Sequence, residues 1–600
     1  MNQTRYCVAR TKPLSRLFKA DRLNIKTFFL ASALSLVGLS TPLSIAQANQ
    51  DQEDSLATSS SFAGSYLSGR SALLSQDLDS AARFFALALS KDPQNYYLQD
   101  RAFVSSLANG DISKAEALIS DIWKNDPDHF LSRFAGSALK IKQLKYDEAI
   151  TILEHGDINP LSQLTFAIIK AWSLAGNGET QAGIETLDDS EGPKWFELFS
   201  NYTAGLLLES SHDWQAASDR YKASYIADPG ALRVANAYAR SLAVTGQTDE
   251  AITVLDEYDK LIPQHPILLQ TRKAIANGSK FEPLALTPSQ GVAEALYSLG
   301  AAISRDGEEL AAAYLQLASH LNPDLGATSI ALGALFNQIG DNERAIQYLE
   351  QVPENSPLKR EAEIQIGLHY NTLDDLDSAR EHLQALMEQD PTDAEAAASL
   401  ANVLRAHEKF KEAETAYTQA IDADASITND DWSLLYFRGI TRERQNKWIE
   451  AEADFRSALE FRPNQPMVLN YLGYSLVDRG EKLDEALEMI KTAVSLRPTD
   501  GYIVDSLGWV YYRLGRYDEA VKELERAIAL RPQDPVINDH LGDAYWKVGR
   551  KLEARFKWNH ARDLDPEPSD LARIMKKIET GQLEEETTSV GTAATSLQDG

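Results

Sequence analysis

Two serine–lysine pairs have the spacing at which a lysine amine could activate a serine hydroxyl for nucleophilic attack. They are Ser137–Lys140 and Ser356–Lys359. Enzymes that use this pair carry companion motifs, and the sequence contains none of them. The first pair falls in a predicted helix and the second in a proline-bearing turn. We therefore interpret both as chance matches and predict no catalytic residue.

Residues that could bind a metal ion are few and scattered. None of the ten histidines lies three or four residues from another, the spacing that would place two ligands on one helix face. We interpret His540 and His560 as packing or surface residues. The only cysteine, Cys7, lies near the N-terminus, ahead of the first long apolar run. Because the phosphate-loop and zinc-protease motifs are also missing, we expect neither a metal nor any other cofactor.

The elements that must position these side chains recur with a period near 34 residues. In residues 501–534, Gly515 ends one predicted helix and Pro532 ends the next. An alanine stands twelve residues before each period-marking proline. Such a period is typical of stacked pairs of antiparallel helices. The marking prolines are Pro93, Pro127, Pro229, Pro263, Pro323, Pro357, Pro391, Pro463, Pro498, Pro532 and Pro566.

The repeating residues resemble the tetratricopeptide repeat (TPR) family. In residues 501–534 the match consists of Leu507-Gly508, Tyr511, Ala520, Ala527 and Pro532, and it returns in the units before and after. The resemblance covers most of residues 62–568. It implies an all-α solenoid, a right-handed superhelix of helix-turn-helix repeats. The fourteen predicted units begin near Phe62, Tyr96, Phe130, Gln163, Leu198, Leu232, Val292, Gly326, Arg360, Ala394, Trp432, Pro466, Gly501 and Pro535.

The resemblance also implies a binding surface, because in this family the first helix of each unit lines a concave groove. In units twelve to fourteen, nine residues at the family's inward-facing positions are our partner-binding candidates. Aromatic side chains supply much of the energy at protein interfaces, and Asn or Asp can hold a peptide. The alternative is that Trp509 and Trp546 pack against adjacent helices. The candidates are Asn470, Tyr474, Tyr502, Asp505, Trp509, Tyr512, Asp539, Asp543 and Trp546.

The N-terminus has the features of an export signal. Residues 1–48 contain seven basic residues and one acid, an apolar run over 28–39 and a final Ala46-Gln47-Ala48. This order predicts a signal peptide that is cut after Ala48. Two alternatives are an uncleaved anchor over 28–45 and a mitochondrial targeting segment.

Breaks in the repeat divide the remaining chain. Glycines and prolines in residues 278–291 predict a linker between two arrays, and the acidic, then Thr-, Ser- and Ala-rich end predicts a disordered tail. The predicted segments are a signal peptide (1–48), a flexible lead-in (49–61), an N-terminal TPR array (62–277), the linker (278–291), a C-terminal TPR array (292–568), a capping helix (569–581) and the tail (582–600).

The formal charge of −29 bears on the kind of partner. Because a surface this acidic repels phosphate backbones, we expect no nucleic-acid partner. No segment outside the repeats is long enough for a catalytic domain, which favours a protein that is not an enzyme.

The stretch from Leu472 to Ile528 resembles exported TPR proteins of proteobacterial envelopes. Some of these are adaptors that hand cell-wall hydrolases to processing proteases. The resemblance implies a scaffold or adaptor in the periplasm of a Gram-negative cell, with protein partners that include an envelope protease or its substrate. The alternative is an envelope assembly factor that faces the periplasm and contacts the membrane through an uncleaved N-terminal segment.

Overall fold

The structure, a computed structural model, describes residues 61–154, 159–303, 307–423 and 432–581. Every regular element within these ranges is an α-helix, which confirms the all-α prediction. None of these helices is long and apolar enough to cross a membrane. The predicted signal peptide (1–48), nearly all of the lead-in (49–61) and the predicted tail (582–600) lie outside the described residues.

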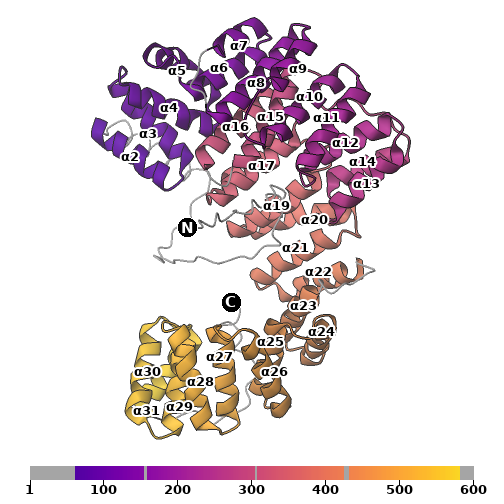
Figure 1. Ribbon diagram of the computed structural model, residues 1–600. Coiled ribbons are helices and arrows are strands. Elements are labelled where there is room, and N and C mark those ends of the chain that lie inside the picture. The colour runs from indigo at the N-terminus through magenta and orange to yellow at the C-terminus, as the bar shows by residue number, and fades with distance from the viewer. Residues whose placement is uncertain (1–60, 155–158, 304–306, 424–431, 582–600) are drawn as a thin grey trace, which may run out of the picture. The chain divides into compact units, whose positions relative to one another are not determined.

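The chain divides into two compact units, Met1–Leu373 and Asp374–Gly600 (Figure 1). The helices of the first unit are α2 (Phe62–Leu74), α3 (Leu78–Lys91), α4 (Tyr96–Asn109), α5 (Ile112–Asn125), α6 (Phe130–Lys142), α7 (Tyr146–Ile152), α8 (Pro160–Gly176), α9 (Thr180–Asp188), α10 (Phe196–Ser210), α11 (Trp214–Ala227), α12 (Leu232–Val244), α13 (Thr248–Asp259), α14 (Pro266–Ala276), α15 (Pro288–Ile303), α16 (Glu308–Leu321), α17 (Gly326–Gln338), α18 (Asn342–Leu349) and α19 (Lys359–Thr372).

The second unit continues the pattern of paired helices. Its helices are α20 (Leu376–Gln389), α21 (Ala394–Ala406), α22 (Phe410–Ala423), α23 (Trp432–Arg444), α24 (Trp448–Phe461), α25 (Pro466–Asp478), α26 (Leu483–Leu496), α27 (Gly501–Arg513), α28 (Tyr517–Leu530), α29 (Pro535–Lys547), α30 (Lys551–Asp563) and α31 (Pro568–Thr580).

Small residues allow the two helices of a pair to approach closely. In α27, Gly508 faces Leu524 of α28, and a Cβ built on this glycine would lie 2.5 Å from the Leu524 Cγ. Ala520 of α28 is completely buried in the same contact layer. Gly515 ends the first helix with a positive φ of 71°, which glycine adopts without strain. The recurring glycine and alanine therefore mark the positions at which the two helices of a pair pack closely.

The first helix of each repeat begins at or within a few residues of its predicted start. The largest difference is four residues, at α15, which begins at Pro288 rather than near Val292. Helix α8 begins at Pro160 rather than near Gln163, because Asn159 caps it by accepting a hydrogen bond from the Ser162 backbone N–H at 3.0 Å. Proline is favoured at the first helical position, where no backbone donor is needed. This proline therefore starts a helix, whereas the period-marking prolines follow one.

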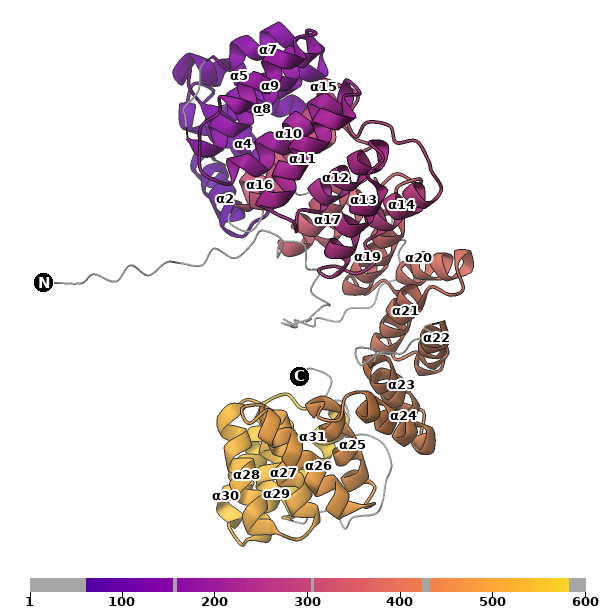
Figure 2. The same cartoon turned by 45° about the vertical axis from the view of Figure 1, so that its right-hand side comes forward.

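In the first unit, the helices after residue 287 pack back onto earlier repeats. Helix α15 contacts α6, α8 and α10, and α16 contacts α4, α5 and α6. Figures 1 and 2 both show α15 and α16 among the earlier helices. Residues 311–318 of α16 are all buried, as expected for a helix that is surrounded on every side. The inner side of the early repeats is therefore covered by the chain itself.

Specific side-chain contacts fix these inner helices. The hydroxyls of Thr165 in α8 and Tyr314 in α16 lie 2.7 Å apart in the buried interior. Glu294 of α15 pairs with Arg233 of α12. As a result, residues 278–291, which we expected to link two arrays, lie inside the first compact unit, and the division of the chain falls between Leu373 and Asp374.

Candidate functional site

The nine predicted partner-binding residues lie on α25, α27 and α29 of the second unit. These helices are the first members of consecutive repeats. Residues 34 apart therefore take equivalent positions on neighbouring helices, as Asp505 and Asp539 do. The same spacing continues into α31, which places Arg573 after Asp539 and Lys577 after Asp543.

Caps at the helix starts hold these positions in register. The Asp500 carboxylate accepts a hydrogen bond from the Tyr502 backbone N–H at 3.1 Å at the start of α27. The Asp534 carboxylate accepts one from the Ile537 N–H at 2.9 Å at the start of α29. A carboxylate here satisfies free backbone donors and interacts favourably with the helix dipole. Because both helices start at the same point of the repeat, their inward residues line up.

A buried ion-pair cluster forms where α29 meets α31. The Lys577 ammonium lies 2.7 Å from an Oδ2 atom of both Asp539 and Asp543. Arg573 lies 3.4 Å from Asp539, and the Trp558 indole N–H donates to the Asp543 carboxylate at 2.9 Å. Charges removed from water need such partners. Lys577 therefore ties the last helix to the repeat before it.

The two carboxylates that share Lys577 respond in opposite ways. Burial raises the pKa of Asp539, but the attraction of Lys577 and Arg573 outweighs it, so the net pKa is lowered. For Asp543, burial dominates over the attraction of Lys577, and the pKa is raised. When two carboxylates share one cation, their pKa values move apart, because the charge of the first opposes the ionisation of the second. The site therefore keeps one carboxylate firmly ionised.

A second buried pair links α27 to α29. The His540 Nδ1 atom lies 3.0 Å from an Asp505 carboxylate oxygen. Burial lowers the pKa of His540, but the Asp505 charge outweighs burial, and the net pKa is raised. The His540 ring stacks on Trp509 with centroids 4.1 Å apart, and Trp509 stacks in turn on Tyr512 at 4.7 Å.

The structure brings the nine candidates onto one side of three helices but leaves few of them accessible. The partly exposed candidates are Tyr502, Trp509 and Trp546. Trp546 packs against Trp558, with ring centroids 5.2 Å apart. The buried candidates are Asn470, Tyr474, Asp505, Tyr512, Asp539 and Asp543. The aromatic candidates thus have both the packing role that we weighed as the alternative and some free surface.

Sequence reasoning did not select the cations of this site. His540 was interpreted as a packing or surface residue, and Arg573 and Lys577 were assigned only to a capping helix. The available signal was the 34-residue spacing from Asp539 and Asp543, which places both cations opposite carboxylates. Two buried polar atoms of the site form no hydrogen bond within the described residues: the Asn470 side-chain oxygen and the Arg573 Nε atom.

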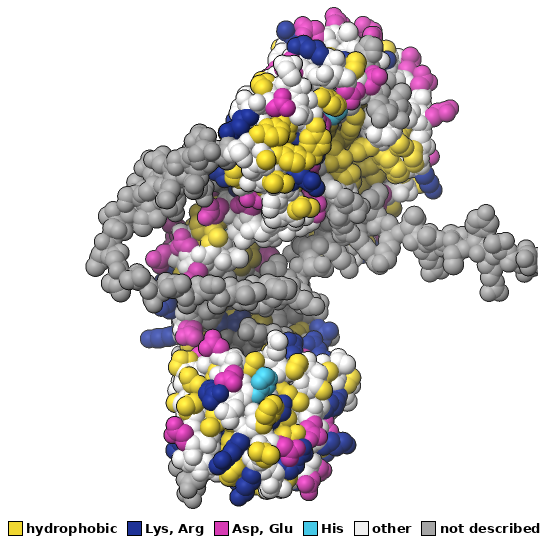
Figure 3. Space-filling model, turned by 90° about the vertical axis from the view of Figure 1, so that its left-hand side faces the viewer, with side chains coloured by type: hydrophobic (Ala, Val, Ile, Leu, Met, Phe, Trp, Pro, Cys, Tyr) yellow, Lys and Arg dark blue, Asp and Glu magenta, His cyan; other side chains and the backbone are white. Residues whose placement is uncertain are grey.

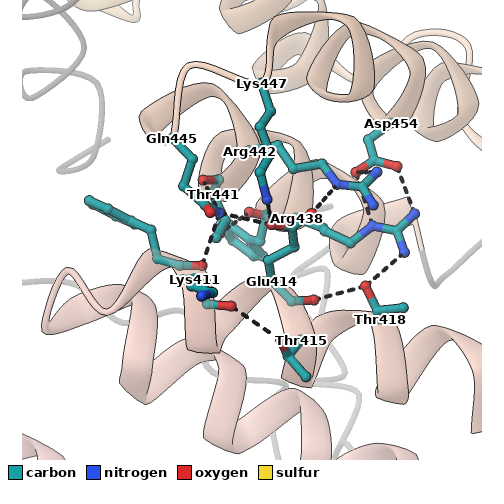
Figure 4. A network of polar contacts seen from close by, with 12 residues as sticks. Lys411, Glu414, Thr415, Thr418, Arg438, Thr441, Arg442, Gln445, Lys447 and Asp454 are labelled. Atoms are coloured by element: carbon teal, nitrogen blue, oxygen red, sulfur yellow. Dashed lines mark hydrogen bonds and ion pairs between the residues drawn. The ribbon is translucent and has the colours of Figure 1, made fainter.

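A separate polar network joins α22, α23 and α24 (Figure 4). Arg438 donates to both oxygens of Asp454, at 2.9 and 2.7 Å. Arg442 bridges Asp454 at 2.8 Å and Glu414 at 3.0 Å. Burial raises the pKa of Glu414, but hydrogen bonds from Lys447 and Arg442 outweigh it and lower the pKa overall. This network holds three consecutive helices together.

Neither cluster has the composition of a reaction centre. Each carboxylate faces a cation that neutralises it, and the Thr418 hydroxyl in the α22–α24 network accepts a hydrogen bond from the Arg438 guanidinium at 3.3 Å. Among the described residues there is no group of three or more His, Cys, Asp or Glu side chains that could hold a metal ion. The arrangement is suited to fixing helices and presenting Tyr502, Trp509 and Trp546 beside them.

Comparison with known proteins identifies the same repeat. A model described as "TPR repeat" matches residues 508–549, and one described as "Tetratricopeptide repeat" matches residues 202–266 and 398–466. The TPR repeat-containing protein PA4667 of Pseudomonas aeruginosa is 40% identical over 98 residues, which are 16% of this chain and 17% of that protein. The match therefore spans about a sixth of the relative's length.

Solved structures of low sequence identity also align. The APC/C hetero-tetramer Cut9–Hcn1 aligns with a TM-score of 0.36 and 16% identity, over 90% of this chain and 99% of that one. A tetratricopeptide repeat protein from Parabacteroides merdae aligns with a TM-score of 0.36 and 16% identity, over 42% of this chain and 99% of that one.

Proposed function

This chain is a tetratricopeptide repeat protein, and from that premise we propose that it is a non-catalytic scaffold that binds other polypeptides through its C-terminal repeats. The observation that carries the proposal is the row of partly exposed aromatics Tyr502, Trp509 and Trp546 on the first helices of consecutive repeats. Rigid aromatic side chains beside fixed polar groups are typical anchors of protein interfaces.

The packing of the first unit supports placing the binding surface on the second unit. In the first unit, α15 and α16 cover the inner side of α4, α6, α8 and α10. A partner cannot use that surface unless these helices leave it. In the second unit, α31 covers Asp539 and Asp543 of α29 through Lys577, but Tyr502, Trp509 and Trp546 stay partly exposed. We therefore assign partner binding to α25, α27 and α29.

The chemistry of the surface favours a polypeptide partner over a nucleic acid. The chain carries a formal charge of −29, which opposes the approach of phosphate backbones. The charges of the inner cluster are already paired, so a partner would gain mainly from contact with aromatic rings.

We also propose that the protein is exported to the periplasm and acts there as an adaptor, with an envelope protease or its substrate as one partner. The basic N-terminus, the apolar run and Ala46-Gln47-Ala48 support export. The partial similarity to PA4667 agrees with a bacterial repeat protein. The alternative is a membrane-tethered assembly factor that keeps residues 28–45 as an anchor.

Site-specific crosslinking tests the binding surface. A photo-reactive amino acid in place of Trp509 should crosslink a polypeptide partner in cells, whereas the same residue in place of Lys522, on the outer face of α28, should not. A Trp509→Ala, Tyr502→Ala variant should lose partner capture with its helicity unchanged. Equal crosslinking from both positions, or undiminished capture by the variant, would move the binding surface elsewhere.

N-terminal sequencing of the protein purified from its own cells tests export. Asn49 as the first residue is the expected result and would exclude the uncleaved anchor. A protein that begins at Met1 or Asn2 would reject the signal peptide and favour the tether.

A further inference from the structure

The segment between α14 and α15 lies against the first unit as an extended chain. Residues 279–287, which we call the strap, form no helix. Their side chains alternate: Pro283 and Ala285 are buried, whereas Glu282 and Leu286 are exposed. Successive side chains of an extended chain point to opposite sides. The strap therefore has one side on the surface of the first unit and the other side in solvent.

Two charged side chains of α10 and α12 hold backbone groups of the strap. The Glu209 carboxylate, which is 1% exposed, accepts a hydrogen bond from the Leu284 backbone N–H at 3.0 Å. The Arg240 guanidinium donates to the backbone carbonyl of Glu282. It also lies over the Phe281 ring, 4.9 Å from the ring centroid. Because both hydrogen bonds go to main-chain groups, which recur in any polypeptide, they recognise an extended chain more than a particular sequence.

The two side chains that hold the strap occupy the repeat positions of two candidates in the second unit. Counted from the predicted starts of their repeats, Arg240 and Trp509 are both the ninth residue, and Glu209 and Tyr512 are both the twelfth. In the first unit these positions contact a polypeptide, and that polypeptide is the chain's own strap.

The helix that follows the strap has contacts of its own. Glu294 of α15 pairs with Arg233 of α12, and Gly291 packs against Trp172 of α8. Release of the strap therefore leaves these contacts of α15 in place. The strap also satisfies its site incompletely, since the Arg240 Nε atom is buried and forms no hydrogen bond within the described residues. Another chain that brings a second acceptor to Arg240 would satisfy this donor as well.

The presence of an occupant distinguishes this surface from the exposed apolar surfaces of the first unit. Hydrophobic side chains gather on one face of that unit, as Figure 3 shows. On α10 and α12, in contrast, the seated strap indicates the chemistry of the ligand: an aromatic ring, a backbone carbonyl, a backbone N–H and a small apolar side chain.

From these contacts we propose that α10 and α12 form a second polypeptide-binding site, which the strap occupies in the free protein and from which an extended partner segment displaces it. The partner segment places an aromatic ring and a backbone carbonyl on Arg240 and a backbone N–H on Glu209. A small apolar residue follows at the place of Ala285. The strap is then a built-in competitor, and the apparent affinity for the partner falls with the fraction of molecules in which the strap is seated.

Fluorescence anisotropy with a labelled peptide that copies residues 278–287 tests the displacement. In the full chain, Phe281→Ala, Ala285→Asp should release the strap while α10 and α12 keep their side chains. This variant should bind the peptide at least about tenfold more tightly than the unchanged chain, because no internal segment competes. The matched control, Lys280→Ala, Leu286→Ser, alters exposed strap residues and should bind as weakly as the unchanged chain. Equal affinities of the released variant and the unchanged chain would overturn the proposal.

Two measurements on the unchanged chain do not depend on the folding of a variant. Saturating peptide should speed hydrogen exchange at the backbone amides of the strap, because the displaced strap loses the contact of Leu284 with Glu209. A peptide with a photo-reactive residue in place of Phe281 should crosslink to α10 or α12. Unaltered exchange in the strap, or crosslinks only outside these two helices, would reject the site.

The same peptide separates this site from the one proposed on the second unit. A Trp509→Ala, Tyr502→Ala chain should show the same strap displacement as the unchanged chain, because neither residue lies on α10 or α12. Loss of displacement in that chain would place the peptide on the second unit and contradict a separate site.

Discussion

Lys577 ties the last helix to the repeat before it through two buried ion pairs. Its ammonium neutralises Asp539 and Asp543, and all three side chains are buried. Removing one partner of a buried ion pair leaves charge without compensation, which costs more than the pair itself contributes.

Replacement of Lys577 by Met should destabilise the second unit by about 3–5 kcal/mol, because Asp539 and Asp543 would lose their shared cation. Chemical denaturation followed by circular dichroism would measure the change. Lys522→Met, on the exposed face of α28, is the control and should change the midpoint little. Equal midpoints for the two variants would mean that the carboxylates find other partners.

His540 gives the same region a pH dependence of defined sign. Its pKa is raised in the folded chain because the Asp505 charge outweighs burial. The pair therefore stabilises the fold fully below the unfolded pKa of about 6.5, and this contribution is lost as the pH rises through the higher folded value. The stability difference between the unchanged chain and His540→Gln should accordingly be larger at about pH 5.5 than at about pH 9.

Denaturation midpoints at both pH values would test this sign. His560→Gln, on the exposed side of α30, is the matched control and should show no such difference. A gap that widens with rising pH would contradict the assignment of the raised pKa to the Asp505 contact.

At the scale of elements, the packing of α15 onto α8 depends on Gly291. A Cβ built at this position would lie 2.0 Å from the indole ring of Trp172, which is fully buried. The two residues come from different repeats, so their contact fixes one repeat against another.

Gly291→Ala should therefore destabilise the first unit by about 1–3 kcal/mol through overpacking. Gly307→Ala is the control, because a Cβ there would have 4.0 Å to its nearest neighbour. Thermal melting of the two variants would compare them. A Gly291→Ala variant as stable as the control would show that α15 shifts away from α8 without cost.

The helices and their pairing could be predicted from the sequence, because the residues that make these contacts recur at fixed positions in each repeat. Gly508, Ala520 and Pro532 fix where helices end and which faces meet. The return of α15 and α16 onto earlier repeats could not be predicted, since it depends on contacts such as Tyr314 with Thr165 that belong to no repeating position. The nine candidates lie on the first helices of their repeats, but their burial depends on partners in neighbouring helices, which the repeat pattern does not give.

At the scale of the whole molecule, the chain divides into two compact units between Leu373 and Asp374. Each has its own buried clusters: the Tyr314 contacts lie in the first, and the Lys577 and Arg438 networks lie in the second. A unit with its own core can fold alone.

Residues 374–600, expressed alone, should therefore form a helical protein that melts over the same temperature range as the corresponding transition of the full chain. Circular dichroism and calorimetry would measure both. A fragment without helicity, or one that melts far below the full chain, would show that the second unit depends on the first.

The return of α16 onto α4 has a mechanical consequence for the first unit. A simple row of repeats can fray from either end, because each repeat touches only its neighbours. Here α16 contacts helices that are far apart in the sequence. Loss of the earliest repeats would therefore expose α16 and destabilise the later repeats at the same time. The first unit should consequently unfold in a single cooperative transition, whereas the repeats of the second unit can unfold one after another from its ends.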